Sequence, residues 1–166
     1  MKVLFDVDTG VDDAAALLYA LFKPRYEIVG IGTVCGNVEA ALAAENTLKI
    51  LDLADAPDIP VAVGAEAPLA GSWPGRVRKI HGDNGLGNVE LPVSSRRLLG
   101  EAVEDFYMRT AEQYEGELTL ITLGPLTNIA RTLEKYPSFA RRIRKMIMMG
   151  GTVAMRGNVS PLGEAN

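Results

Sequence analysis

The stretch KVLFDVDTGVDDAAALLYALF, residues 2–22, joins a short apolar run to an amphipathic run through an acidic turn. Residues 2–7 are almost continuously apolar and predict a buried β-strand, whereas residues 12–22 are rich in good helix formers and predict a helix. Four aspartates fall within eight residues at the junction: Asp6, Asp8, Asp12 and Asp13. Side-chain packing does not require them, and their mutual repulsion opposes such crowding.

The remaining sequence repeats this alternation of short apolar runs and longer amphipathic runs. Further strands are predicted at residues 26–34, 59–64, 117–123 and 144–151, and further helices at residues 38–54, 98–114 and 125–136. Pro125 is expected at the first position of its helix, where proline is tolerated. The pattern predicts an α/β protein with a mostly parallel, Rossmann-like sheet flanked by helices, in a single domain over residues 1–166.

Two segments differ from this pattern. Residues 65–97 form a connection rich in glycine and proline, and such a length is unusual in a compact domain unless the segment is functional. Residues 152–166 leave the last strand and end in polar residues without a closing helix. Within that strand, Met146, Met148 and Met149 are predicted to lie in the core.

The composition excludes several classes of protein. A hydrophobic content of 48% with 23% charged residues is typical of a globular protein, and the net charge of −4 gives no general attraction to nucleic acid or anionic membranes. Cys35 is the single cysteine, which excludes an internal disulfide framework and fits a reducing compartment. No window approaches the ~20 apolar residues of a membrane span. We therefore expect a cytoplasmic protein that binds neither nucleic acid nor membranes.

Polar side chains follow each predicted strand at the same end of the sheet. In open α/β sheets, ligands bind in the crevice beyond the carboxyl ends of the strands. The residues placed there are Asp8, Asp12, Asp13, Gly36, Asn37, His81, Asp83, Asn84, Thr127, Asn128, Asn158, Glu164 and Asn166. This convergence predicts a binding site at that edge.

Simpler explanations exist for single residues. Asp12 could cap the first helix, Asp13 could favour its positive end, and Asn37 could be a turn former. His81 could lie on the surface as easily as in a site. Capping does not explain four aspartates, however, because several carboxylates in one turn repel unless a cation lies among them. An oxygen-only cluster suits Ca²⁺ or Mg²⁺, and Gly10 would let the backbone fold tightly around the ion.

Five ordered motifs resemble those of one enzyme family. DVDTGVDD (6–13) resembles the DxDxGxDD signature of the inosine–uridine-preferring nucleoside hydrolases. GTVCGN (32–37) is similar to the TVxGN segment of that family, and HGDNGLG (81–87) to its HGxxGLG loop. LGPLTNIA (123–130) resembles its GxLTNIA turn, and MGG…GNVSPLGEAN (149–166) its MGG…GNxTPxAEFN stretch. The resemblance extends over the whole chain.

The resemblance implies hydrolysis of the N-glycosidic bond of ribonucleosides, purine or pyrimidine, to ribose and free base with a bound Ca²⁺. By motif position, Asp8 would bind calcium and act as general base on its bound water. Asp13 and the backbone carbonyl of Leu123 would be further calcium ligands, and Asp6 would support the cluster. His81 would be catalytic, in a mobile loop near the base. The implied ribose-binding residues are Asp12, Asn37, Asn158, Glu164 and Asn166.

The chain also departs from the family pattern. Thr9 stands where the family commonly has proline, and Ala165 where it usually has phenylalanine. Family members continue well beyond this length and supply a further calcium-binding aspartate with a histidine next to it. The chain therefore resembles the N-terminal portion of such an enzyme, as a truncated gene product, a proteolytic remnant or half of a split protein. Since calcium prefers ~6–8 oxygen ligands, we expect weakened metal affinity.

Two other functions compete with this interpretation. A truncated paralogue could keep the fold and bind nucleosides without effective catalysis. A phosphohydrolase of the haloacid-dehalogenase type also has DxD after a strand, but Gly10 stands where that family has threonine or valine. An incomplete sheet would leave apolar surface uncovered, so we expect self-association; the nucleoside hydrolases, often dimers or tetramers, suggest a homo-oligomer as well.

Overall fold

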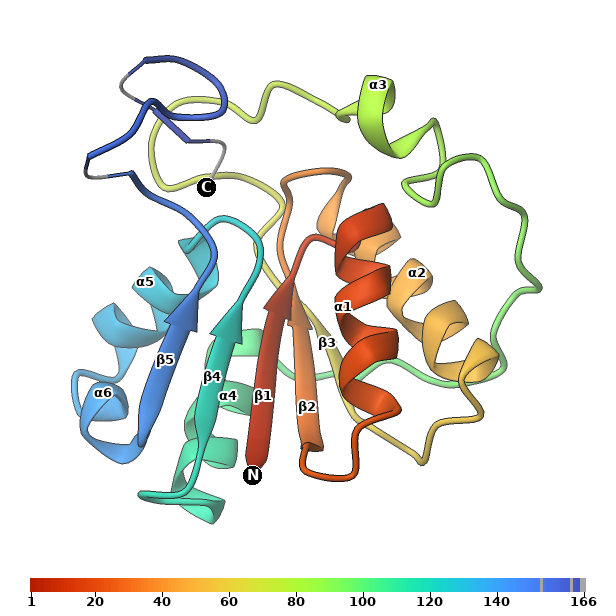
Figure 1. The fold of residues 1–166 in the computed structure, drawn as a ribbon. Helices are drawn as coiled ribbons and strands as arrows, with labels where there is room; N and C mark the ends of the chain where they lie inside the picture. The colour runs from red at the N-terminus through yellow and green to blue at the C-terminus, as the bar shows by residue number, and fades with distance from the viewer. Residues whose placement is uncertain (153, 162, 165–166) are drawn as a thin grey trace.

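Five parallel strands form one sheet in the computed structural model, which describes residues 1–152, 154–161 and 163–164 (Figure 1). Their spatial order is β3-β2-β1-β4-β5. The strands are β1 (Lys2–Val7), β2 (Glu27–Thr33), β3 (Val61–Val63), β4 (Thr119–Thr122) and β5 (Lys145–Met148). The helices are α1 (Val11–Leu21), α2 (Ala40–Leu53), α3 (Arg78–His81), α4 (Val103–Gln113), α5 (Thr127–Lys135) and α6 (Phe139–Arg142). The predicted α/β class with a parallel sheet is confirmed.

Helices cover the sheet on both faces because strand side chains alternate. Val3, Phe5 and Val7 of β1 pack with α1 and α2 in one apolar core. Leu4 of β1 and Leu120 of β4 point to the opposite face and pack with α4, α5 and α6 in a second core. Figure 1 shows the two helical layers on either side of the strands. This arrangement explains why β1 is apolar at nearly every position.

Several predicted boundaries are wrong for identifiable reasons. The helix predicted to begin at residue 98 begins at Val103, because the Leu99 N–H donates to the Val61 carbonyl (2.8 Å) and keeps this segment beside β3. Pro125 is not the first helical residue; Leu126 is the N-cap and the helix begins at Thr127. The short helices α3 and α6 were not predicted, since four residues carry too little periodicity to detect.

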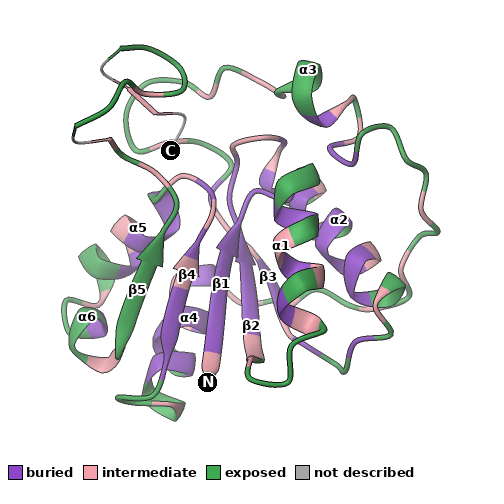
Figure 2. Cartoon of the chain, in the orientation of Figure 1, coloured by how far each residue is buried: buried purple, intermediate pink, exposed green. Residues whose placement is uncertain are grey.

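The methionine-rich strand β5 is exposed, which contradicts its predicted place in the core. Met146, Met148 and Met149 are 36%, 49% and 45% exposed, and Ile147 is 42% exposed. Figure 2 shows β5 exposed along its length, whereas β1, on the other side of β4, is largely buried. β5 is an edge strand, paired with β4 alone among the described residues, so its apolar character has no covering layer there. The predicted uncovered apolar surface is therefore present.

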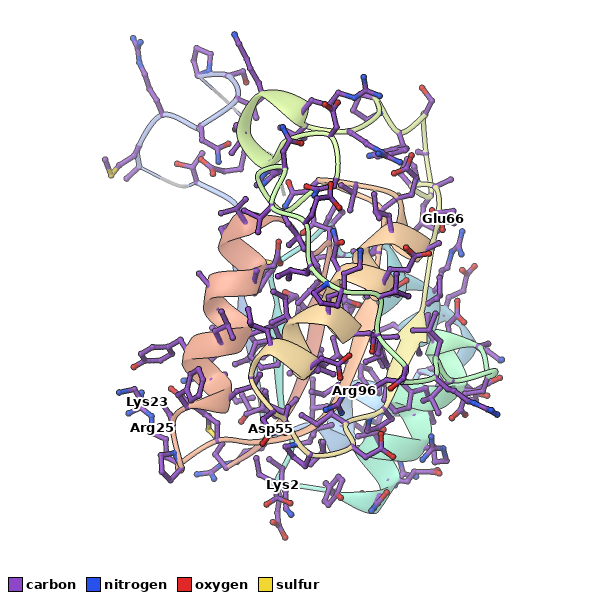
Figure 3. The ribbon with its side chains drawn as sticks, turned by 90° about the vertical axis from the view of Figure 1, so that its right-hand side faces the viewer. Lys2, Lys23, Arg25, Asp55, Glu66 and Arg96 are labelled. Atoms are coloured by element: carbon purple, nitrogen blue, oxygen red, sulfur yellow. The ribbon has the colours of Figure 1, made fainter. Side chains whose placement is uncertain are left out.

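The connection 65–97 is tied to the rest of the molecule at many points. Glu66 accepts hydrogen bonds from two backbone N–H groups at the start of α2 (2.8 Å each), and the Trp73 indole N–H donates to the Gly36 carbonyl (2.8 Å). Near the other end, Arg96 pairs with Asp52 (2.6 Å); Figure 3 labels Glu66 and Arg96. Within the described part of the chain, no helix is long and apolar enough to cross a membrane.

Candidate functional site

The polar residues gather where the strand order reverses. From β1 the chain proceeds to β2 and β3 on one side, and later returns to β4 and β5 on the other. In open α/β sheets, ligands commonly bind at such a reversal, beyond the carboxyl ends of the two central strands, here β1 and β4. Asp8 follows β1, Asn37 follows β2 and Leu123 follows β4 at this edge.

Asn37 joins two of the four aspartates. Its backbone N–H donates to Asp8 Oδ2 (2.7 Å), and its side-chain Nδ2 donates to Asp13 Oδ2 (3.2 Å). The same Asp13 oxygen accepts the Gly10 N–H (2.9 Å) at the start of α1. Asp13, rather than Asp12, therefore satisfies the helix start, and Asn37 is more than a turn former. This triad of Asp8, Asn37 and Asp13 is the centre of the site.

One oxygen of each triad carboxylate is buried and, in the described part of the chain, has no hydrogen-bond partner. Asp8 and Asp13 are each 2% exposed, and among the described residues neither Asp8 Oδ1 nor Asp13 Oδ1 has a hydrogen-bond partner. Burying an unpaired carboxylate oxygen is unfavourable unless a cation or a hydrogen-bond donor compensates it. Helix capping accounts for Oδ2 of Asp13 but leaves its Oδ1 unexplained.

The electrostatics of the buried carboxylates agree with this crowding. Burial raises the pKa of Asp8 to about 6, although the Asn37 N–H opposes the rise. Burial and, next, the neighbouring Asp8 carboxylate raise the pKa of Asp13 to about 8. Burial likewise raises the pKa of Asp6 to about 7, against hydrogen bonds from Tyr107 and Asn128. At neutral pH the Asp8–Asp13 pair thus tends to keep a proton between its members.

The four aspartates do not surround a single point, contrary to the simplest form of the prediction. Strand alternation directs Asp6 toward α4, where its Oδ2 accepts the Tyr107 hydroxyl, and the side chain of Asp12 is 56% exposed on α1. Accordingly, the described residues hold no ready-made cluster of three or more His, Cys, Asp or Glu side chains for a metal. Asp8 and Asp13 remain as the side chains that could ligate one ion.

These two carboxylates fit a hard divalent cation. Their free oxygens are buried, and oxygen donors without nitrogen or sulfur suit calcium or magnesium. Leu123 lies next to Gly124, where a Cβ would come within 3.0 Å of Asp8 Oδ1, so the backbone after β4 passes beside that oxygen. A cation there could therefore also meet the Leu123 carbonyl. Calcium prefers ~6–8 oxygens, so water or substrate would supply the remainder.

Glycines make room for the triad. A Cβ on Gly36 would lie 2.0 Å from Asp8 Oδ2, and a Cβ on Gly10 would lie 2.6 Å from His81 Nδ1. Gly10 has an extended backbone (φ −94°), so space rather than conformational freedom requires glycine there. The sequence suggests that Gly10 permits a tight turn around an ion, whereas in the structure a side chain at this position would collide with His81.

His81 is buried beside α1, which contradicts a surface position. It is 5% exposed at the end of α3, and its Nδ1 accepts the Val11 N–H (3.2 Å). Asp12 Oδ1 lies 3.7 Å from the same nitrogen. Acceptance by Nδ1 favours the neutral tautomer with its proton on Nε2. The histidine thus links the 65–97 connection to the acidic turn.

The last predicted site residues lie in another segment. The Asn158 N–H donates to Glu164 Oε1 (2.9 Å), so these two residues belong to one loop, with Asn158 exposed. Asn166 lies outside the described residues. Of the other polar residues at the strand ends, Asn84 organises its own loop by accepting the Leu86 and Asn88 N–H groups (2.9 and 3.0 Å).

Tyr107 is the residue near the site that sequence reasoning missed. It lies in the middle of α4, more than ninety positions from the acidic turn, and its hydroxyl donates to Asp6 (2.5 Å). An aromatic residue in an amphipathic helix indicates ordinary core packing. The available signal was Gly32 in β2, since a Cβ there would lie 1.9 Å from the Tyr107 hydroxyl oxygen.

Comparison with known proteins agrees with the geometry. The sequence model of the family described as inosine-uridine preferring nucleoside hydrolase matches residues 3–166. Uridine nucleosidase 1 of Arabidopsis thaliana is 42% identical over 165 residues, which are 99% of this chain and 49% of that protein. The non-specific ribonucleoside hydrolase RihC of Klebsiella pneumoniae is 38% identical over 171 residues, 100% of this chain and 54% of that protein.

Solved structures show the same fold. The plant nucleoside hydrolase PpNRh1 superposes with a TM-score of 0.94 at 37% identity, over 99% of this chain and 52% of that one. The purine-preferring ribonucleoside hydrolase from Gardnerella vaginalis gives a TM-score of 0.96 at 38% identity, over 100% of this chain and 54% of that one. The chain thus spans about half the length of the relatives it matches.

Proposed function

Because this chain belongs to the inosine-uridine preferring nucleoside hydrolase family, we propose that it carries a calcium- and ribose-binding site for hydrolysis of the N-glycosidic bond of ribonucleosides. The observation that carries the proposal is the triad: two buried carboxylates, joined by Asn37, at the switch point of the sheet. Each has one oxygen without a hydrogen-bond partner among the described residues. We propose further that residues 1–166 form one domain corresponding to the N-terminal portion of the longer relatives.

In this proposal Asp8, Asp13 and the Leu123 carbonyl hold the cation. When bound, calcium lowers the pKa of a coordinated water and so favours its deprotonation near neutral pH. Asp8 acts as the general base that accepts the proton of the attacking water. Both carboxylates also stabilise the positive charge that develops on the sugar as the bond to the base breaks.

The ribose is bound by neutral and acidic side chains in the same proposal. Asp12 is exposed at the start of α1, and the other ribose-binding residues are Asn37, Asn158, Glu164 and Asn166. Fixed hydrogen-bonding groups of this kind orient a sugar while tolerating different bases. His81, with its proton on Nε2, is assigned as a catalytic donor near the base. Its hydrogen bond from Val11 holds the ring next to Asp12.

Release of ribose from inosine and uridine in the presence of CaCl₂ tests the proposal. Asp8→Asn should lower the rate by about 10²–10⁴-fold, as expected for loss of a general base. Asp58→Asn is the matched control, because Asp58 is exposed and precedes β3, at the opposite end of the sheet from the triad. Equal ribose release by wild type and Asp8→Asn would contradict the assigned base.

A second candidate function is nucleoside binding without effective catalysis. The observation that favours it is that two of the four aspartates, Asp8 and Asp13, meet through Asn37, whereas Asp6 turns toward α4. Absence of ribose release from the wild-type chain, with inosine or uridine bound in calorimetry, would support this candidate over the first. The family match gives no support to the haloacid-dehalogenase alternative.

We also propose that the chain forms a homo-oligomer and acts in the cytoplasm. The exposed apolar edge strand β5 supports self-association, because unpaired strand edges and apolar patches pair readily. A free cysteine, Cys35, buried in the fold suits a reducing compartment.

A further inference from the structure

A buried hydrogen-bond network lies beneath the acidic turn, on the α4 face of the sheet. The Tyr107 hydroxyl donates to Asp6 Oδ2 (2.5 Å), and Asn128 Nδ2 donates to the same oxygen (2.9 Å). All three side chains are 0% exposed. Asp6 Oδ1 is buried and has no hydrogen-bond partner among the described residues, so the Asp6 side chain is held through Oδ2 alone. Its members come from β1, α4 and the first turn of α5.

Two glycines, one in β2 and one directly after β3, leave room for this network. A Cβ on Gly32 of β2 would lie 1.9 Å from the Tyr107 hydroxyl oxygen. A Cβ on Gly64, which directly follows β3, would lie 2.4 Å from Asn128 Oδ1. Any larger residue at either position would displace a member of the network. The space beside Gly32 is therefore filled by the Tyr107 hydroxyl, and the space beside Gly64 by the Asn128 side-chain amide.

Asn128 connects the ends of three strands. Besides its bond to Asp6, its Nδ2 donates to the Thr33 carbonyl at the end of β2 (2.9 Å). Its Oδ1 accepts the Ala65 N–H beyond β3 (2.9 Å). The carboxyl ends of β1, β2 and β3 are thus fixed relative to one another and to α5 through a single amide.

The triad begins where these connections end. Asp8 follows Asp6 by two residues, and Asn37 follows Thr33 by four, so the network fixes both chain segments just before they meet. Their meeting point is the 2.7 Å hydrogen bond from the Asn37 N–H to Asp8 Oδ2. Small displacements between the ends of β1 and β2 would change this distance directly.

We propose that Tyr107 and Asn128 are positioning residues for the triad. Tyr107 fixes the Asp6 side chain, Asn128 transmits that position to Thr33, and together they set the placement of Asp8 against Asn37. The inference rests on the proposed function only for the meaning of the triad as a calcium site; the mechanical coupling stands independently.

Amide hydrogen exchange of the metal-free protein tests the coupling. Tyr107→Phe removes the hydroxyl and keeps the ring in its core, and the Asn37 N–H, donor to Asp8, should then exchange at least tenfold faster. The rise must exceed the change seen in protected α2 amides such as Leu48, which report any general loss of stability. Tyr114→Phe is the matched control, because that hydroxyl accepts the Gln113 side chain at the surface.

The same variants separate this inference from the proposed function. Calorimetric titration with CaCl₂ should show at least a tenfold weaker Kd for Tyr107→Phe and no change for Tyr114→Phe. A wild-type chain that binds no calcium overturns the proposed function, while the exchange experiment still decides the coupling. Asn37 exchange that rises only as much as Leu48 exchange overturns the inference. Asn128→Ala is the second variant if Tyr107→Phe does not fold, with the same expected pattern.

Discussion

Substitution of Gly36 by alanine should damage the triad more than the size of a methyl group suggests. The added Cβ would lie 2.0 Å from Asp8 Oδ2 and 2.8 Å from Asp8 Cγ, well inside ordinary van der Waals contact. Pro125 lies 2.9 Å from it on another side, so the methyl group cannot retreat that way. Asp8 must therefore move, and the 2.7 Å bond from the Asn37 N–H is lost.

Two effects set the magnitude. Overpacking a well-filled region costs about 1–3 kcal/mol. Loss of a hydrogen bond to a charged group costs about 1.5–3 kcal/mol. We expect the free energy of unfolding to fall by at least about 2 kcal/mol. If the bond to Asp8 also supports the cation, the calcium Kd should weaken roughly 30-fold, since 1.4 kcal/mol corresponds to tenfold.

Urea unfolding and calorimetric calcium titration measure these two quantities. Gly100→Ala is the matched control, because no heavy atom lies within 4 Å of the position its Cβ would take. The control should leave both quantities unchanged. If Gly36→Ala retained wild-type stability and calcium affinity, the close packing around Asp8 would have no energetic role, and the assignment of the triad would fail.

Three further outcomes follow from the same site and from β5. The pKa values of Asp6 (about 7), Asp8 (about 6) and Asp13 (about 8) are raised, so the metal-free folded state binds more protons than the unfolded state. The free energy of unfolding, measured with urea, should therefore fall as pH rises from about 4 to about 8. A free energy of unfolding that stays constant across that range would contradict buried, metal-free carboxylates. Asp13→Asn should weaken calcium binding at least tenfold by calorimetry yet flatten this pH dependence, because the amide cannot ionise; an unchanged Kd would remove Asp13 from the ligands. Ile147→Lys on β5 should shift sedimentation toward monomer, and an unaltered distribution would exclude this edge.

The sequence predicted the layers of the fold well because local patterns determine them. Residues 2–7 were predicted as a strand and form β1 with those bounds, since their apolar run is buried on both faces. Failures arose where tertiary contacts override local pattern. Leu99 joins the edge of β3 instead of starting α4, and the methionines of β5 have the composition of a core strand but lie at an exposed edge.

The site was predictable only in part, and the division has a physical cause. Asp8 and Asp13 carry a local signature, because carboxylates crowded into one turn demand an explanation within that turn. Tyr107 and the bracing role of Asn128 carry none, since both depend on contacts about one hundred residues away in sequence. His81 was ambiguous for the same reason: its burial depends on how the 65–97 connection meets α1.

The arrangement of the triad indicates why the fold accepts an unfavourable charge distribution. Asn37 and Gly10 supply N–H donors to the Oδ2 atoms of Asp8 and Asp13, which leaves both Oδ1 atoms buried and, within the described residues, unpartnered. A protein selected for stability alone would place apolar side chains here, because paired buried charges rarely outperform well-packed hydrophobic residues. Positive charge reverses this balance, since a divalent ion interacts favourably with the same oxygens that repel each other without it. A divalent ion bound at these oxygens would therefore offset the energetic cost of the buried pair, and the glycines and amides around the triad hold the two carboxylates in that arrangement.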